Sequence, residues 1–201
     1  MSTASRYILV LAVLVLSFFF AREIFGTDEI LHPPGMLAPE TPRQTLIPKG
    51  KPWELRDYHI TPLASYHITA KVLGKERYRF GRESELSPFD LALGWGPMSD
   101  QIIVDRLEIW QSGRWYYWQA KTLPLPKQAL ITSSANTHII PANKDIKDLL
   151  AIIRVGEIIT LRGALVAVKA EDGWQWRSSL KRDDTGQGAC EVFWVEEVEL
   201  E

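Results

Sequence analysis

An uncharged and almost wholly apolar run, YILVLAVLVLSFFFA, extends from Tyr7 to Ala21, between Arg6 and Arg22. As a helix of roughly 1.5 Å rise per residue, this run spans about 22 Å. The hydrocarbon core of a bilayer is roughly 30 Å thick and is usually crossed by about 20 residues, so uncharged flanking residues must extend the span. We predict a transmembrane anchor over residues 1–25.

Two alternatives compete with an uncleaved anchor. A cleaved signal peptide ends in a small-residue exit, whereas Phe19, Phe20 and Ala21 lead directly into Arg22. A buried core helix usually has a polar stripe, whereas this run is apolar all round. The pattern therefore favours attachment to the membrane through residues 7–21.

The charges that flank this run predict its orientation. Lys and Arg counts set topology, and Arg6 on one side nearly balances Arg22 on the other. The amino-terminal amine adds a positive charge to the leading side, which favours the cytoplasm for that end. We therefore expect a single-pass protein of the cytoplasmic membrane with an extracytoplasmic carboxy-terminal domain.

A proline-rich stretch follows over residues 26–52. Its prolines disfavour a regular helix or a central strand and favour an extended, semi-rigid chain. The pattern predicts a tether, followed by a soluble β-rich domain over residues 53–201. At about 150 residues this domain can bury its own core.

Alternation with period two predicts strands through most of the domain. The predicted strands cover residues 65–74 and 75–80, a hairpin of 102–110 with 114–119, a strand over 157–169 that bends at Gly163, and, after a turn at 172–173, strands over 174–177 and 190–199. One clear helix begins after Asn143, which is a suitable N-cap. Its apolar stripe comprises Ile146, Leu149, Leu150 and Ile153.

This order of elements predicts a mainly β (α+β) domain. A helix between the third and fourth strands, with a glycine bend in a long strand, is typical of a small antiparallel OB-like barrel with one packed helix. Another antiparallel barrel or a sandwich with a packed helix is the alternative.

Composition narrows the chemistry. Lys and Arg number 23 against 25 Asp and Glu, so the chain lacks the global positive field that nucleic-acid binding uses, and a nucleic-acid partner is not expected. The single cysteine, Cys190, excludes an internal disulfide and a multi-cysteine metal site. The four histidines show no metal-binding spacing. We predict neither a metal nor a cofactor.

A basic ridge is the first candidate binding surface. Lys75, Arg77 and Arg79 share one face of a predicted strand, which suits an anionic ligand. A solvated cationic strand face is the alternative interpretation.

Aromatic residues form the second candidate. Trp95 lies in a glycine-rich and proline-rich loop over residues 87–100, where it can contribute to function or fasten the loop to the core. Trp115 and Tyr117 share one face of their strand, opposite Tyr116 and Trp118. Such a pair can stack on sugars or bases, or it can be covered by a neighbouring loop.

No catalytic constellation is visible in the sequence. The residues to test first for a hidden hydrolase are His67, His138, Asp100 and Asp105. Cys190 with either histidine is a further combination that nothing local supports.

Four stretches carry a family resemblance: SPFDLALGWGPMSD, SGRWYYW, SSANTHIIP and RDDTGQGACE. They resemble blocks of an uncharacterised family of bacterial single-pass membrane proteins of the cell envelope, over most of residues 53–199. The resemblance implies an envelope protein and carries over no catalytic residue.

The leading hypothesis is a membrane-anchored, extracytoplasmic binding or interaction module for a protein partner or an anionic ligand. An envelope hydrolase that uses His67 or His138 with a nearby carboxylate is one alternative. A cytoplasm-facing nucleic-acid-binding barrel is the other.

Overall fold

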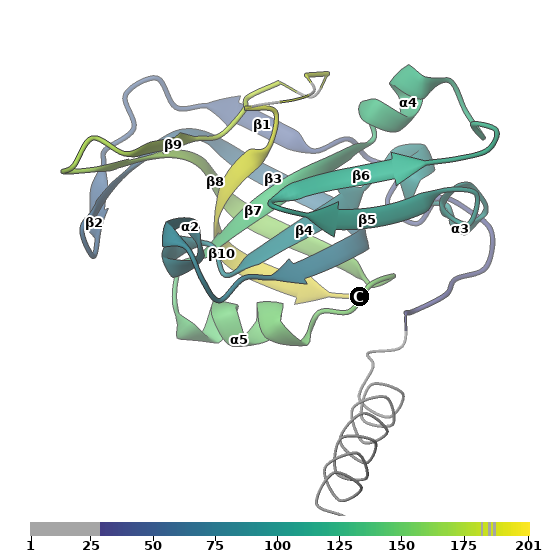
Figure 1. Ribbon diagram of the computed structural model, residues 1–201, viewed down its shortest axis with the longest axis horizontal. Coiled ribbons are helices and arrows are strands. Elements are labelled where there is room, and N and C mark those ends of the chain that lie inside the picture. Colours follow the sequence, from purple (N-terminus) through teal and green to yellow (C-terminus); the bar gives the residue numbers. More distant parts are fainter. Residues whose placement is uncertain (1–28, 182, 185, 187) are drawn as a thin grey trace, which may run out of the picture.

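The computed structural model describes residues 29–181, 183, 184, 186 and 188–201, and this part of the chain is mainly β (Figure 1). The predicted anchor, residues 1–25, lies outside the described residues. Among the described helices, none combines the length and the apolar character required to cross a bilayer.

The strands and helices are short apart from three long strands. The strands are β1 (Arg43–Leu46), β2 (Trp53–Leu55), β3 (Tyr58–Arg77), β4 (Phe89–Gly94), β5 (Glu108–Ser112), β6 (Trp115–Gln119), β7 (Ser134–Pro141), β8 (Ile158–Ala170), β9 (Gln175–Arg177) and β10 (Glu191–Leu200). The helices are α2 (Arg82–Leu86), η1 (Gly96–Ser99), α3 (Gln101–Val104), α4 (Lys127–Ile131) and α5 (Lys144–Ile152).

Five strands form a nearly closed ring in the order β3, β4, β7, β10 and β8, and β8 pairs with β3 to close it. The mainly β class is therefore confirmed. The prediction of a wholly antiparallel arrangement is wrong in one place, because β10 runs parallel to β7. A closed ring with an odd number of strands cannot alternate direction throughout, so at least one neighbouring pair must be parallel.

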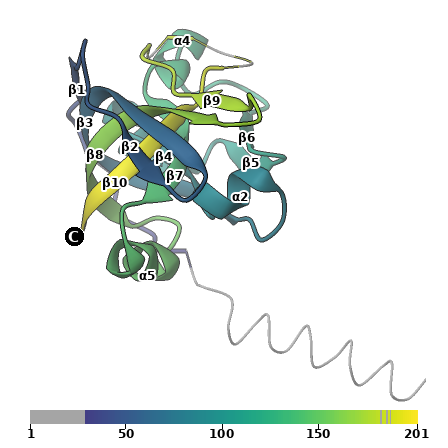
Figure 2. The ribbon, with the colours of Figure 1, turned by 90° about the vertical axis from the view of Figure 1, so that its left-hand side faces the viewer.

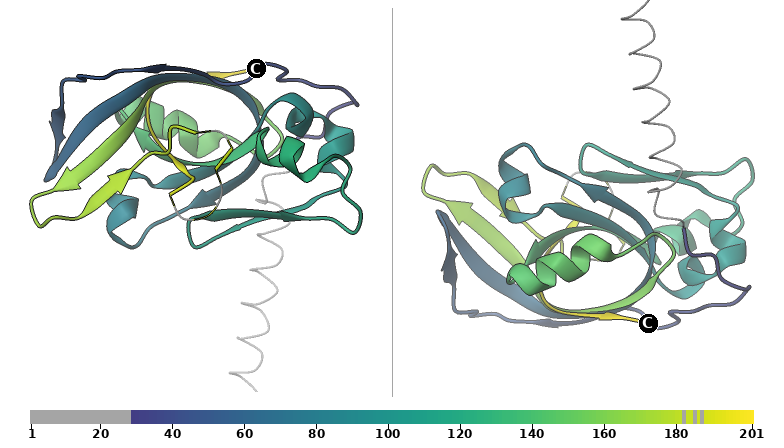
Figure 3. Two further views of the ribbon diagram at one scale, coloured as in Figure 1. Left: turned by 90° about the horizontal axis from the view of Figure 1, so that it is seen from above. Right: turned by 90° about the horizontal axis from the view of Figure 1, so that it is seen from below.

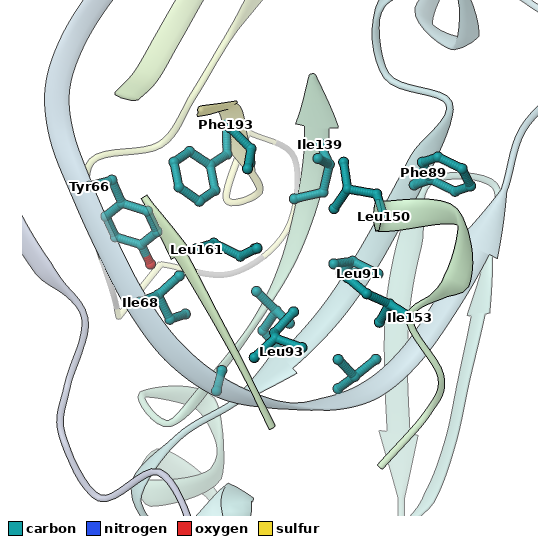
Figure 4. Packing of buried hydrophobic residues seen from close by; sticks show 14 of the residues in the cluster. Tyr66, Ile68, Phe89, Leu91, Leu93, Ile139, Leu150, Ile153, Leu161 and Phe193 are labelled. Atoms are coloured by element: carbon teal, nitrogen blue, oxygen red, sulfur yellow. The ribbon is translucent and has the colours of Figure 1, made fainter. Parts of the chain in front are cut away.

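The core of the ring is built from the inward positions of its strands (Figure 4). Tyr66, Ile68, Ala70 and Val72 are buried there, as the period-two pattern predicts. In β8, Gly163 lies opposite a bulge in β10, and a Cβ at this position would come within 2.0 Å of the Trp194 carbonyl oxygen. The predicted bend thus coincides with a close approach of two backbones that only glycine permits.

Helix α5 closes the lower end of the ring, where it lies across the opening (Figure 3). The Asn143 side chain accepts a hydrogen bond of 2.9 Å from the Ile146 amide, so the predicted N-cap is confirmed. Ile146, Leu150 and Ile153 are buried against the ring. Leu149 was predicted in the same stripe but is exposed, because a nine-residue helix covers the opening with one narrow face.

The long connection between β4 and β7 contains η1, α3, the β5–β6 hairpin and α4. The hairpin is confirmed, and its turn places both Gly113 and Arg114 at positive φ, as a tight two-residue turn requires. The segment 102–107, predicted as strand, is wrong: a short helix and turn occupy it, and Asp100 caps that helix by accepting from the Ile102 amide.

A second core lies outside the ring, where β2, β9 and the outer ends of β3 and β8 extend beyond it (Figure 1). Trp53 packs edge-on against Trp194 with ring centroids 5.2 Å apart. Trp174 and Trp176, predicted to share one face of their strand, both pack against this cluster.

The proline-rich segment that the sequence predicts as a tether lies against the domain from residue 29 onward. The Ile30 amide donates to the Val155 carbonyl at 2.9 Å, and Ala38 is buried. Strand β1 adds to the free edge of β3. Proline prevents the segment from entering the sheet as a central strand, but its remaining amides can still bond to turns and edges.

Candidate functional site

The basic ridge does not present three free charges. Lys75 Nζ donates to the carbonyls of Ala151 and Ile153 at 2.8 Å each, so it caps the carboxyl end of α5. Burial lowers the pKa of Lys75 to about 8, against an opposing effect of Glu157. Arg79 is exposed, and Arg77 lies with its guanidinium 5.8 Å from the centre of the Phe89 ring.

The cause of this arrangement is a bulge in β3 between Val72 and Gly74. One extra residue reverses which side of a strand faces inward. After the bulge, Lys75 and Arg77 therefore lie on the side of the buried Phe89. Without the bulge, the period-two alternation of residues 65–74 places Lys75 and Arg77 on the outward face. A bulge cannot be read from the alternation, so the sequence did not predict the change of face.

Three of the four predicted catalytic candidates, Asp100, Asp105 and His67, do not form a histidine–carboxylate pair with one another. Asp100 is held at the start of α3, where it also accepts from the Gly35 amide at 3.0 Å. Asp105 accepts from Gln101 Nε2 at 2.6 Å, beside the buried Lys71, whose ammonium group donates to Gln101. His67 lines an open groove on the outer face of β3. These contacts are structural, and they bring no candidate histidine to either carboxylate.

The fourth candidate, His138, has a carboxylate partner that sequence reasoning missed. His138 Nδ1 lies 2.9 Å from Asp90 Oδ1, and Arg114 Nη1 donates to the same oxygen at 2.8 Å. Asp90 is completely buried and His138 is 4% exposed. The signal available in the sequence was weak: Asp90 is the one charged residue of the otherwise apolar strand β4, and its partner across the sheet, His138, is one of several polar residues of β7.

This cluster fastens the hairpin to the ring. Arg114 also donates to the Ser87 carbonyl at 3.0 Å, and its guanidinium lies 3.9 Å from the centre of the Tyr78 ring. The Trp176 ring covers His138, with ring centroids 4.8 Å apart. The aromatic rings and the hairpin exclude solvent from Asp90 and His138. We call the group of Asp90, Arg114 and His138, which joins β4, the hairpin turn and β7, the polar lock.

A pocket of about 150 Å³ lies at the other end of the ring from α5, beside the hairpin. Figure 2 shows α5 below the strands and α4 above them. The last residue of α4, Ile131, lines the pocket. Four aromatic side chains contribute to the pocket walls, together with polar groups from β7 and from the segment before β10. The aromatic lining residues are Trp95, Trp115, Tyr116 and Trp118; the charged ones are Lys181, Asp184 and Glu191.

Each wall of this pocket is positioned by a neighbouring element. Trp95 is 1% exposed and belongs to the ring core, so it is fixed. Tyr116 and Trp118 pack against a third apolar cluster under the hairpin. Asn136 donates to the Arg114 carbonyl at 3.0 Å and accepts from Gln111 at 2.9 Å, which ties β7 to β5 and to the turn of the hairpin.

The pocket contains the chain's single cysteine in a protonated state. The pKa of Cys190 is raised to about 12, chiefly by burial and also by the negative charges of Glu191, Asp90 and Asp184, against an opposing effect of the hydrogen bond with Asn136. A thiol nucleophile needs the opposite shift. Cys190 is therefore a wall residue of the pocket and not an activated nucleophile.

The predicted aromatic pair separates in the structure. Trp115 lines the pocket, whereas Tyr117 stacks on Trp110 on the open face of the hairpin, with ring centroids 5.3 Å apart and planes 14° apart. Tyr116 and Trp118, assigned to the opposite face, also line the pocket. The sequence located the aromatic strand correctly, but it could not show which side another segment covers.

Among the described residues, no group of three or more His, Cys, Asp or Glu side chains could hold a metal ion. No family model, curated protein or solved structure matches the chain.

Proposed function

We propose that this protein is a membrane-anchored, extracytoplasmic binding module that holds a small ligand in the aromatic pocket. The observation that carries the proposal is the pocket itself: a preformed hollow of about 150 Å³ with four aromatic side chains and two carboxylates in its walls. Concave sites with mainly apolar walls and a few polar groups are the usual form of small-molecule sites.

An OB-like barrel is the fold that best accounts for the position of this pocket. The ring order, with α5 between its third and fourth strands, supports that assignment. OB barrels commonly bind ligands over their second and third strands and at the adjoining loops. Here the β5–β6 hairpin lies beside those strands, so the opening that remains is between the hairpin and the segment before β10.

The chemistry of the lining favours a small organic cation, such as an amine or a quaternary ammonium group. Aromatic faces attract cations, and a carboxylate in partly desolvated surroundings adds to the attraction. Asp184 is half-buried in the lining, whereas Lys181 is the one described cation there and is exposed. This modifies the expectation of an anionic ligand, which rested on the basic ridge.

The hydrolase alternative is less well supported. His138 and Asp90 are close, but Trp176 covers the histidine, and neither residue lines the pocket. The nucleic-acid alternative depends on a basic surface, and Lys75 is engaged by α5. We therefore propose a binding role without catalysis.

The experiment is a titration of the purified full chain with tetramethylammonium and, as a neutral comparison, glucose, monitored by tryptophan fluorescence and calorimetry. Trp115→Ala should weaken binding of the cation by about 3- to 30-fold, as expected for the loss of one aromatic contact with a cation. Trp110→Ala is the matched control, because Trp110 lies on the same hairpin outside the pocket. Equal effects of the two variants, or no saturable binding of the cation, would contradict the proposal.

The predicted orientation needs a separate test. A carboxy-terminal alkaline phosphatase fusion should be active in a bacterial host, because that enzyme folds only outside the cytoplasm. An inactive fusion that is expressed at a normal level would place the domain in the cytoplasm and would leave the pocket assignment untouched.

A further inference from the structure

The described chain begins beside the carboxyl end of α5. The Ile30 amide donates to the Val155 carbonyl at 2.9 Å, and His32 Nε2 lies 2.8 Å from the Gly156 carbonyl oxygen. Gly156 is so close to this segment that a Cβ there would lie 2.0 Å from the Ile30 carbonyl oxygen. The start of the described chain is therefore fixed to the closed end of the ring.

The outward side of this end carries exposed apolar side chains. Ile152 is 63% exposed and Leu149 is 36% exposed, and both lie on α5 beside its buried stripe. Leu31, which is 70% exposed, lies between the two residues that bond to the turn after α5. Seen from below, α5 is the outermost element of this end (Figure 3).

The length of chain before this face limits its distance from a membrane. Seven residues, 22–28, separate the apolar run, residues 7–21, from Glu29. Even a fully extended chain of that length spans at most about 25 Å. The face that carries Ile152 and Leu31 is thus the part of the domain that is tethered nearest to the bilayer.

Positive and negative side chains balance on this face, so it has no net charge that would favour binding to anionic lipids. Lys144 pairs with Asp148, and Arg154 pairs with Glu157 at 3.2 Å. Lys147 and Asp145, one of each sign, are also exposed on α5. A helix with exposed apolar residues and balanced charges suits the boundary between headgroups and acyl chains, where apolar side chains leave water.

We infer that the outer side of α5, with Leu31, rests on the surface of the membrane and inserts Ile152 and Leu149 among the lipids. The pocket, at the opposite end of the ring, then opens away from the bilayer. This inference rests on the anchor of the proposed function, but it does not depend on the ligand or on which side of the membrane the domain occupies.

The test uses the full chain with Cys190→Ala, reconstituted in phosphatidylcholine vesicles. A nitroxide label is attached to a single new cysteine, either Ile152→Cys or the control Gln128→Cys, which is exposed on α4 near the other end. Collision with a water-soluble nickel chelate and with oxygen is then measured for each label. The label at 152 should collide at least several-fold less with the chelate than the label at 128, and more with oxygen.

A second pair of variants shows whether the apolar side chains cause this contact. With the label at Lys147→Cys, the double change Leu149→Ser and Ile152→Ser should increase collision with the chelate, whereas Leu123→Ser, an exposed leucine outside α5, should not.

Vesicle-bound chain in which the labels at 152 and 128 are equally accessible to the chelate would overturn the inference while leaving the anchor in place. A chain that does not float with vesicles would remove the anchor and the inference together. Neither result would alter the cation titration, which reports on the pocket separately.

Discussion

The two ends of the five-stranded ring are closed in different ways. At the lower end, α5 inserts Ile146, Leu150 and Ile153, and the closure is apolar. At the upper end, the hairpin is held by Asp90 and Arg114, and an open pocket remains beside it. The close-packed apolar side chains at the lower end leave no room for a ligand. At the upper end, the hairpin is held by a buried ion pair, and a pocket remains beside it.

The largest expected effect is on the polar lock. Arg114→Ala leaves the carboxylate of Asp90, which is fully buried, without its principal cation. Loss of one partner of a buried ion pair costs about 3–5 kcal/mol. Chemical denaturation of the full chain should show this loss in the free energy of unfolding, together with loss of cation binding.

The matched control is Arg77→Ala, which also removes an arginine that lies near an aromatic ring. Arg77 is exposed, and its guanidinium lies 5.8 Å from the centre of the Phe89 ring. An equal decrease in the free energy of unfolding in the two variants would show that the buried Asp90–Arg114 pair does not stabilise the upper end more than an exposed arginine does.

The lower end is tested by two adjacent leucines. Leu150→Ala should lower the free energy of unfolding by about 2–5 kcal/mol, because it leaves a cavity in close-packed surroundings. Leu149→Ala, at a position 36% exposed, should cost much less. Cation binding at the upper end should survive both changes, as measured by the fluorescence titration at a temperature where each variant is folded. Loss of binding in folded Leu150→Ala would mean that the two ends are not independent.

The smallest effect concerns pH at the lower end. The pKa of Lys75 is about 8 in the folded chain, against an ordinary value of 10.5. Between these values the unfolded chain retains a proton that the folded chain has released, so a rise in pH favours folding. Relative to Lys75→Met, the native chain should gain stability as pH rises from 8 to 10.5. Denaturation curves across this range would show it, and a constant difference between the two proteins would contradict it.

The sequence predicts those parts of the fold that depend on neighbours along the chain. The alternation in β3, the Asn143 cap of α5 and the tight turn before β6 all follow from local patterns. The parallel pairing of β7 with β10 depends on how the ring closes, which no local pattern encodes.

The candidate site shows the same division. The aromatic strand and Trp95 could be singled out, because large aromatic residues are conspicuous in any segment. The partnership of Asp90, Arg114 and His138 could not, since it joins β4, the hairpin turn and β7. The bulge after Val72 is a single-residue irregularity, and it places Lys75 and Arg77 on the opposite face from the one that alternation predicts.

The parallel pair also has a consequence for synthesis of the chain. Strand β10 follows the other four ring strands in the chain and pairs residues 191–195 with 137–141, so the edges of β7 and β8 stay unpaired until β10 is available. Exposed strand edges in incomplete chains promote association with other chains. Truncation before β10 should therefore give an aggregating chain, and a nascent chain must be protected until β10 has been synthesised.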